Sequence, residues 1–411
     1  MAVVHCAPLV LPIDGEPIEN GAVAIEGTHV VAVGTRADVV TPGARVREWR
    51  GVLTPGLVNA HTHLQYTDFA DLAKAGMPFA QWIRTLTERR YTWTPPQWQE
   101  SVRRGVHEVL RTGTTCVADV VTDVAALPVL ARSGLAGAAY VEVVGVESYR
   151  WPLASEELLA KLANAPSGSD LGGSPHALYS LGTQAITGSL DVARERGLRL
   201  HPHLAETEHE DEYVRCGTGP IAEFGQSRGL TYELLGAGTG RSPVAYADEL
   251  GMLGNDVHVA HGVHASAEDR ALLRERGTAV ALCARSNEIL GAGTPPVTAY
   301  LAESSPVAVG TDSRASSPSL DLLEEVRALH GLALAQGASR DGLAKRLVEA
   351  ATIGGAFALG RSDVGRIAPG ARADLAVFDV PDGDPYESLV AHGAGRCVAT
   401  VLGGRLVHRR S

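Results

Sequence analysis

The most constraining feature of the sequence is a long middle region in which apolar, strand-like runs alternate with helix-like stretches. Eight strand-like runs occur, at residues 57–63, 115–121, 138–144, 176–181, 199–204, 257–262, 279–283 and 307–311. The helix-like stretches between them include residues 97–112, 155–164, 188–196, 267–275 and 319–335. Such alternation indicates parallel strands joined by helical crossovers. Eight units predict an α/β fold, a (β/α)8 TIM-type barrel. The alternative is an open doubly wound sheet, but the Gly-rich phosphate turn that normally follows its first strand is absent from the sequence.

Both ends of the chain show a different pattern. Short apolar runs cut by Gly-containing turns lie at residues 22–25, 30–33, 374–378, 397–402 and 405–407. The pair Gly403-Gly404 is typical of a hairpin turn between the last two runs. We therefore predict a small composite β-domain, a β-sandwich made from residues 1–53 plus 363–411. The catalytic barrel would then span residues 54–362.

Composition narrows the range of partners. The formal net charge of −11 argues against nucleic acid and anionic membranes. No apolar run approaches the roughly 18 residues of a membrane span, and the N-terminus lacks the pattern of a signal peptide. Five scattered cysteines without a CxxC pair indicate a reduced compartment. We expect a cytoplasmic protein that acts on a small molecule, with a homodimer as one candidate assembly.

Polar residues gather where the predicted strands end. In a (β/α)8 barrel the C-terminal ends of the strands carry the chemistry. Histidines or carboxylates end four strands: His61 and His63, then His201, His203 and Glu206, then His261 and His264, then Asp312. Alternate residues of a strand point to the same side, so His61 and His63 can face one metal ion. Imidazole plus carboxylate suits zinc or iron(II), whereas magnesium and calcium prefer oxygen ligands. Hydrogen bonds at the barrel rim are the alternative explanation.

These motifs resemble those of a known family. Leu53-Thr-Pro-Gly-Leu-Val-Asn-Ala-His-Thr-His63 resembles the opening signature of the amidohydrolase superfamily. Four later motifs resemble strands five to eight of its nucleobase and nucleoside aminohydrolase branch: His203-Leu-Ala-Glu206, Ala260-His-Gly-Val-His264, Cys283-Ala-Arg-Ser-Asn287 and Gly310-Thr-Asp-Ser313. This branch contains cytosine, guanine and adenosine-type deaminases. The resemblance extends over nearly the whole chain.

The resemblance implies a set of roles for these residues. The metal ligands would be His61, His63, His203 and Asp312, holding one zinc ion, with iron(II) as the alternative. Asp312 and His261 would be catalytic groups that orient a metal-bound water and take its proton. Glu206 would carry a proton to the ring nitrogen next to the attacked carbon. Two-metal members need a bridging lysine or glutamate on strand three or four. None of the three lysines lies there, and although Glu142 could in principle bridge, the branch favours one metal.

Contacts to the substrate are harder to place from the sequence. His176 matches a position that lines the pocket of nucleoside-type members, and Asn287 matches one near that pocket. Gln65 could hydrogen-bond a ring edge and Trp82 could stack on a base, although solvation or packing explains these two residues equally well. Arg285 places a permanent cation inside the strand-seven motif, which would suit an anionic tail on the substrate.

The overall pattern is most similar to that of deaminases of adenosine derivatives, including aminodeoxyfutalosine deaminase of menaquinone biosynthesis. We therefore expect a mononuclear metal-dependent aminohydrolase that deaminates an adenine-type nucleoside derivative and releases ammonia. Aminodeoxyfutalosine is the candidate substrate, because its benzoate would give Arg285 an anionic partner. The alternatives are a cytosine- or guanine-type nucleobase deaminase and a hydrolase of a cyclic amide or chlorinated ring. A non-catalytic scaffold would be expected to lose metal ligands, and this chain keeps all four.

Overall fold

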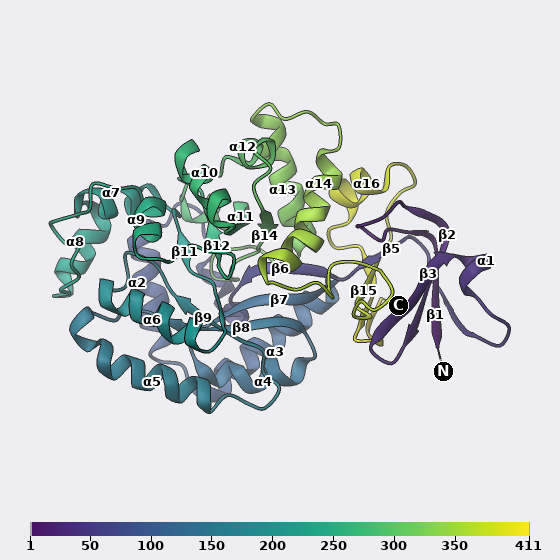
Figure 1. Ribbon diagram of the computed structural model, residues 1–411, viewed down its shortest axis with the longest axis horizontal. Coiled ribbons are helices and arrows are strands. Elements are labelled where there is room, and N and C mark those ends of the chain that lie inside the picture. The colour runs from purple at the N-terminus through teal and green to yellow at the C-terminus, as the bar shows by residue number, and fades with distance from the viewer. Residues whose placement is uncertain (1, 411) are drawn as a thin grey trace.

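The computed structural model describes residues 2–410, and its middle region forms the predicted barrel (Figure 1). The barrel strands are β6 Leu57–Thr62, β7 Thr114–Val121, β8 Ala136–Val143, β9 Leu171–Pro175, β10 Arg199–Leu200 with β11 His203–Leu204, β12 His258–His261, β13 Ala279–Leu282 and β14 Val307–Val309. Neighbouring strands pair in parallel, in the orders β10-β9-β8-β7-β6 and β11-β12-β13-β14. Single bridges from Leu200 to Val257 and from Thr62 to Asp312 close the two groups into one ring.

Helices surround the barrel (Figure 1). They are α2 Phe79–Arg90, α3 Pro95–Arg111, α4 Leu127–Ser133, α5 Trp151–Ala163, α6 Thr183–Glu195, α7 Glu208–Cys216, α8 Gly219–Ser227, α9 Pro243–Glu249, α10 Ala267–Arg276, α11 Ala284–Leu290, α12 Val297–Ala302, α13 Leu322–Ala335, α14 Leu343–Glu349 and α15 Gly355–Ala358. Local sequence explains where they begin: Ser266 and Asp269 form a capping box at the start of α10. Within residues 2–410, no helix combines the length and the apolar character needed to cross a membrane.

The fourth barrel strand lies earlier than the sequence predicted. It is β9, and the predicted run 176–181 instead follows this strand as turns. The sequence pattern did not indicate β9, because Gly172 and Gly173 lack the β-branched side chains that are typical of a strand. At Gly172 the absence of a side chain is required, since a Cβ there would lie 2.3 Å from the ring of Tyr140. The correction places His176 directly after the C-terminal end of the strand, on the rim of the barrel.

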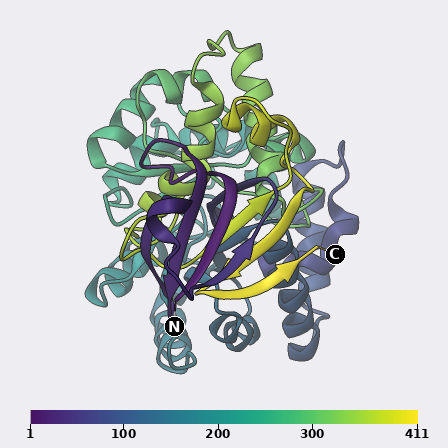
Figure 2. The same cartoon turned by 90° about the vertical axis from the view of Figure 1, so that its right-hand side faces the viewer.

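The two ends of the chain pair in one sheet beside the barrel, so the composite β-domain is present (Figure 2). Its strands are β1 Val3–Val10, β2 Ile18–Glu26, β3 His29–Thr35, β4 Arg45–Glu48, β5 Val52–Pro55, β15 Leu375–Phe378, β16 Cys397–Leu402 and β17 Arg405–Arg409. The short helix α1 Arg36–Val39 packs against β2 and β3, whereas α16 Pro385–His392 packs against the barrel helices α13 and α14. All eight strands belong to one continuous sheet, and β5 runs to Pro55, past the predicted boundary at residue 53. The N-terminal and C-terminal parts of the sheet meet where β5 pairs antiparallel with β15, and we call this junction the seam.

The barrel interior contains two imidazoles beneath the rim. His201 and His258 are fully buried, and their rings stack with centroids 3.8 Å apart. The buried ring of Tyr140 contacts both, at 5.2 Å and 5.4 Å between centroids. His201 lies between β10 and β11, where Pro202 interrupts the strand because proline has no N–H to donate. The core of the barrel is therefore polar just below the site.

Candidate active site

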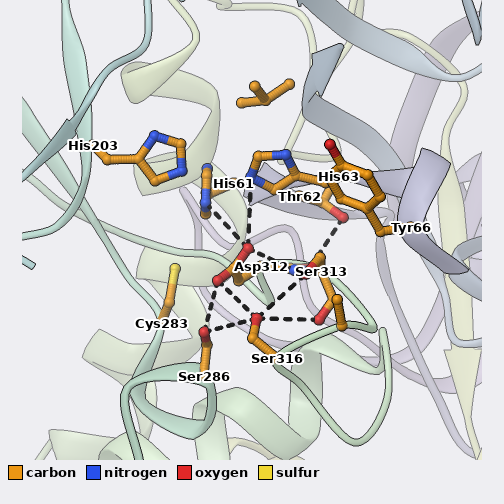
Figure 3. A network of polar contacts seen from close by, with 12 residues as sticks. His61, Thr62, His63, Tyr66, His203, Cys283, Ser286, Asp312, Ser313 and Ser316 are labelled. Carbon is orange, nitrogen blue, oxygen red and sulfur yellow. Dashed lines mark hydrogen bonds and ion pairs between the residues drawn. The ribbon is translucent and has the colours of Figure 1, made fainter. Parts of the chain in front are cut away.

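Four imidazoles and a carboxylate converge at the C-terminal ends of the barrel strands, and Figure 3 shows the carboxylate of Asp312 with the rings of His61, His63 and His203. His61 lies in β6 and His63 just after it, His203 begins β11, His261 ends β12, and Asp312 follows β14. All five are at most 6% exposed. Ligand atoms of His61, His63 and Asp312 lie within 4.8 Å of one another, and so do those of His61, His203 and His261. Because His61 belongs to both groups, the five side chains surround one point.

Two imidazole nitrogens without partners make this point a candidate metal site. Nε2 of His61 and Nε2 of His261 are buried without a hydrogen-bond partner among residues 2–410. An unpaired buried polar group costs about 1–3 kcal/mol. Nε2 of His61 and Nε2 of His63 lie 3.5 Å and 3.6 Å from Oδ1 of Asp312. A carboxylate and several neutral imidazoles are ligands typical of zinc or iron(II), so the residues present fit a transition metal.

A chain of hydrogen bonds determines which nitrogen of His61 faces the metal site. Nδ1 of His201 lies 2.9 Å from the carbonyl oxygen of His258, and it must donate because a carbonyl only accepts. Burial lowers the pKa of His201 and of His61, so each ring is neutral and carries one proton. Nε2 of His201 therefore accepts from Nδ1 of His61, which lies 2.8 Å away. This directs the lone pair on Nε2 of His61 toward the site. In the same way, Nδ1 of His203 lies 3.2 Å from the carbonyl oxygen of His176.

We expect His201→Phe to weaken metal binding by about 10- to 100-fold, the usual effect of losing a residue that orients a metal ligand. Phenylalanine keeps an aromatic ring against His258 but cannot accept the proton of His61. Competition with a chromophoric chelator at fixed pH measures the affinity. His258→Phe is the matched control, because it retains the backbone carbonyl to which His201 donates. An equal loss in both variants would assign the effect to packing.

Serine hydroxyls and the backbone position Asp312. Its Oδ2 accepts from the hydroxyls of Ser286 at 2.6 Å and Ser316 at 2.9 Å, and its Oδ1 accepts from the backbone N–H of Ser313 at 2.6 Å (Figure 3). Burial acts to raise the pKa of Asp312, but the neighbouring imidazoles outweigh it and hold that pKa well below the usual range. Asp312 also has φ of 58°, a left-handed conformation that is uncommon for a residue with a side chain. Such local strain is typical of functional sites.

Glu206 has the properties of a proton carrier. It is 4% exposed, and its Oε2 accepts from the hydroxyl of Tyr179 at 3.0 Å. Its Oε1 lies 3.6 Å from Nε2 of His261. Burial raises the pKa of Glu206 to about 7, the charge of Asp312 adds to the rise, and the bond from Tyr179 opposes it. A carboxyl group with such a pKa can both give and take a proton near neutrality.

A cavity of about 390 Å³ opens from this cluster. His63, His203, Glu206 and Asp312 lie in its wall. Aromatic and polar groups that contribute further to the lining are Tyr66, Phe79, Trp82, Glu142, His176 and Tyr179. Residues of α2 and α8 supply apolar side chains, among them Ile83, Leu86, Ile221 and Phe224. The volume and the mixed lining suit a small organic ligand with a few polar groups.

Two predicted substrate contacts lie in this wall. His176 exposes its ring to the cavity, and its Nδ1 lies 2.8 Å from the hydroxyl of Ser180. Trp82 lines the cavity while its Nε1 donates to the carbonyl oxygen of Ala315 at 2.9 Å. Trp82 therefore both anchors α2 to the loop after β14 and offers part of its ring to a ligand.

Arg285 requires a correction. It does not line the cavity, and its guanidinium is directed toward α13. Its Nε donates to Glu325 at 2.7 Å, and Nη1 donates to Glu324 and to the hydroxyl of Ser319. Nη2 donates to the carbonyl oxygens of Ser319 and Asp321. Because these partners occupy the whole donor fork, Arg285 has no N–H left for a substrate. It joins α11 to α13 in place of the predicted role.

Gln65 and Asn287 also differ from their predicted roles as substrate contacts. Gln65 is fully buried, and its amide donates to the hydroxyl of Thr122 at 2.8 Å and accepts from the backbone N–H of Asp123 at 3.1 Å. Asn287 is fully buried as well, and its amide contacts Nδ1 of His261 at 3.1 Å. Neither residue lines the cavity. Gln65 ties the loop after β6 to the end of β7, and Asn287 orients the ring of His261.

The sequence analysis missed Tyr179, Ser286 and Ser316. Tyr179 lies in the run that was assigned to a strand, so its direction could not be inferred. Ser286 belongs to the strand-seven motif and follows Arg285, so the motif itself carried this signal. Ser316 comes four residues after Asp312, and its contact with the carboxylate depends on the turn that brings it back.

Comparison with known proteins identifies the family. Residues 52–407 match the model of the amidohydrolase family. The chain belongs to the amidohydrolase family. It is therefore a metal-dependent hydrolase that acts on C–N bonds, as the sequence motifs predicted.

Relatives of this amidohydrolase include nucleoside deaminases. It is 32% identical over 391 residues to the 5-methylthioadenosine/S-adenosylhomocysteine deaminase of Pelotomaculum thermopropionicum, covering 91% of this chain and 84% of that relative. A zinc-bound adenosine deaminase from Xanthomonas campestris is 26% identical, with a TM-score of 0.81 and coverage of 99% and 93%. The aminofutalosine deaminase of Helicobacter pylori shares the fold at 21% identity, with a TM-score of 0.82 and coverage of 99% and 100%.

Proposed function

We propose that this amidohydrolase deaminates the adenine ring of a nucleoside derivative and releases ammonia. The observation that carries the proposal is Glu206, a buried carboxyl group whose pKa is raised to about 7, placed in the cavity wall beside the ligand cluster. Removing an amino group from a purine ring requires a proton on the adjacent ring nitrogen, and Glu206 can supply it. The deaminase relatives support the same chemistry.

The residues divide the chemical task between them. One metal ion, proposed to be zinc with iron(II) as the alternative, would be held by His61, His63, His203 and Asp312 and would supply a Lewis acid and an activated water. Asp312 would orient the attacking water and take its proton together with His261. Glu206 would give a proton to the ring nitrogen, while the hydroxyl of Tyr179 holds its other oxygen in place.

The cavity wall suits the rest of a nucleoside. Trp82 and Phe79 are stacked at 6.2 Å between ring centroids and offer a surface for a planar base. Glu142 is buried, lines the cavity and lies 4.0 Å from Nε2 of His176. A carboxylate accepts from two adjacent hydroxyl groups, so we assign Glu142 and His176 to the sugar. Glu142 belongs to neither ligand group found among the described residues, which agrees with one metal per chain.

A substrate panel tests the proposal. We expect the metal-loaded protein to release ammonia from adenosine derivatives with modified 5′ ends, including 5-methylthioadenosine, S-adenosylhomocysteine and aminodeoxyfutalosine. Cytosine, guanine and a chlorinated triazine serve as comparisons, because they represent the alternative substrate classes. An enzyme-coupled ammonia assay measures kcat/KM for each compound. Turnover of cytosine or guanine far above every adenosine derivative would contradict the nucleoside assignment, and chloride release from the triazine would point to the other class.

A further inference from the structure

The cavity wall contains a guanidinium group whose donors have no hydrogen-bond partner among residues 2–410. Arg90 is the last residue of α2, and its side chain lines the cavity. Its guanidinium makes no hydrogen bond and no ion pair with any residue from 2 to 410. The charges of Glu142 and Asp123 act on Arg90, but neither carboxylate lies within hydrogen-bond or ion-pair distance of it. Guanidinium groups that are partly removed from water are normally hydrogen-bonded, because burying unsatisfied polar groups is costly. Arg90 therefore has its donor fork free for a ligand.

Two other arginines near Arg90 do have partners. Arg89, the preceding residue on the same helix, donates to both oxygens of Asp71, at 2.6 Å and 2.7 Å. Arg228, which also lines the cavity, is nearly half exposed, and it lies 3.9 Å from Glu88 and over the ring of Phe224. Arg90 differs from both because no carboxylate among residues 2–410 lies within ion-pair distance of it, and Glu142 and Asp123 act on it only from further away. The helix thus places one paired arginine outside the cavity and one unpaired arginine in its wall.

We propose that Arg90 binds a carboxylate carried by the substrate beyond its adenine nucleoside, on the 5′ substituent; this rests on the proposed function. A carboxylate matches the planar fork of one guanidinium with two parallel hydrogen bonds. A phosphate dianion is a poorer match, because the nearby Glu142 adds negative charge to the same wall. Arg90 thereby takes the role that the sequence suggested for Arg285.

The apolar part of the lining indicates what joins the nucleoside to the carboxylate. Ile83 and Leu86 come from the same helix as Arg90, and Ile221 and Phe224 come from α8. Such side chains favour an aryl or alkyl linker over a polar one. The substrate class is therefore an adenine nucleoside whose 5′ substituent is apolar and ends in an acid.

A matched pair of compounds tests this inference on the metal-loaded enzyme. The acid is 5′-deoxy-5′-(3-carboxyphenylthio)adenosine, and its partner is the corresponding carboxamide. We expect the parent enzyme to prefer the acid, and Arg90→Met to lower kcat/KM for the acid by about 10- to 150-fold, the range expected for a charge-assisted contact. The carboxamide should change little. Arg90→Lys should retain part of the preference, since lysine keeps the charge without the planar fork.

Controls separate the possible failures. Arg89→Met, one residue earlier on the same helix, should leave the ratio of acid to amide unchanged. An equal loss for acid and amide in Arg90→Met would show that Arg90 only offsets Glu142 or packs the wall, and would overturn the inference. Absence of any preference in the parent enzyme would overturn it too. Calorimetric binding of the acid separates this inference from the proposed function. If Arg90→Met abolishes binding of the acid, the anion site is supported. If no adenosine derivative is deaminated, only the proposed function is contradicted.

Discussion

Glu206→Gln is expected to lower kcat by about 10²–10⁴-fold, the usual contribution of a general acid–base group. Glutamine is almost isosteric and can still accept from the hydroxyl of Tyr179, but its amide cannot exchange a proton near neutrality. The metal ligands are untouched, so metal content should stay at the parent's value. Steady-state kinetics with an adenosine derivative and elemental analysis of the same preparation measure both quantities.

Tyr179→Phe is the matched comparison for this prediction. It removes the hydrogen bond to Oε2 of Glu206 and leaves the carboxyl group in place. Its effect on kcat should therefore be much smaller than that of Glu206→Gln. Parent-like activity in Glu206→Gln would exclude this residue as the proton carrier and would direct attention to His261, whose Nε2 lies 3.6 Å from it.

His203→Ala should remove metal and activity together. The carbonyl oxygen of His176 holds Nδ1 of His203, which turns the other ring nitrogen toward the cluster. Alanine leaves three predicted ligands at a site that needs four, so the variant should purify with little metal and show no measurable turnover. Metal that binds only the folded state also stabilises it, so Tm should fall. Elemental analysis and thermal unfolding provide the measurements.

The chelator-treated parent protein is the control for His203→Ala. Both should show the same low Tm and the same lack of activity. Added zinc should restore the treated parent but not the variant. A variant that kept one equivalent of metal and full activity would show that His203 is no ligand, and the alternative group of His61, His203 and His261 would fall with it.

Strand periodicity explains why the convergence of several predicted ligands could be inferred from the sequence. His61 and His63 lie two residues apart at the end of an apolar run, so the pattern alone gave them a common direction. Asp312 closes another such run, and the barrel rule placed both strand ends on one rim. The pairing of the two chain ends was likewise inferred from short apolar runs separated by Gly-containing turns. In each case the prediction depended on backbone geometry, which local sequence largely determines.

Side chains outside the strands were harder to predict. Arg285 sits in a recognisable motif, yet its direction depends on Glu325, which lies 40 residues later on another helix. Arg89 and Arg90 are adjacent and chemically identical, and only the position of Asp71 decides that one is paired and the other is not. Sequence periodicity says which face of an element a residue occupies. It does not say which distant carboxylate will meet it.

The seam between the chain ends has a consequence for how the protein is made. β5 ends at Pro55, and β6, which contains His61, begins two residues later. Pro55 pairs with Leu375, and the N–H of Gly56 donates to the carbonyl oxygen of Asp374 at 2.9 Å. During synthesis β5, which leads directly into the strand with the predicted ligand His61, therefore leaves the ribosome long before its partner β15 exists. Contacts between such distant segments form late and slow folding. Metal capture should thus belong to the final stage of maturation, after nearly the whole polypeptide has been translated.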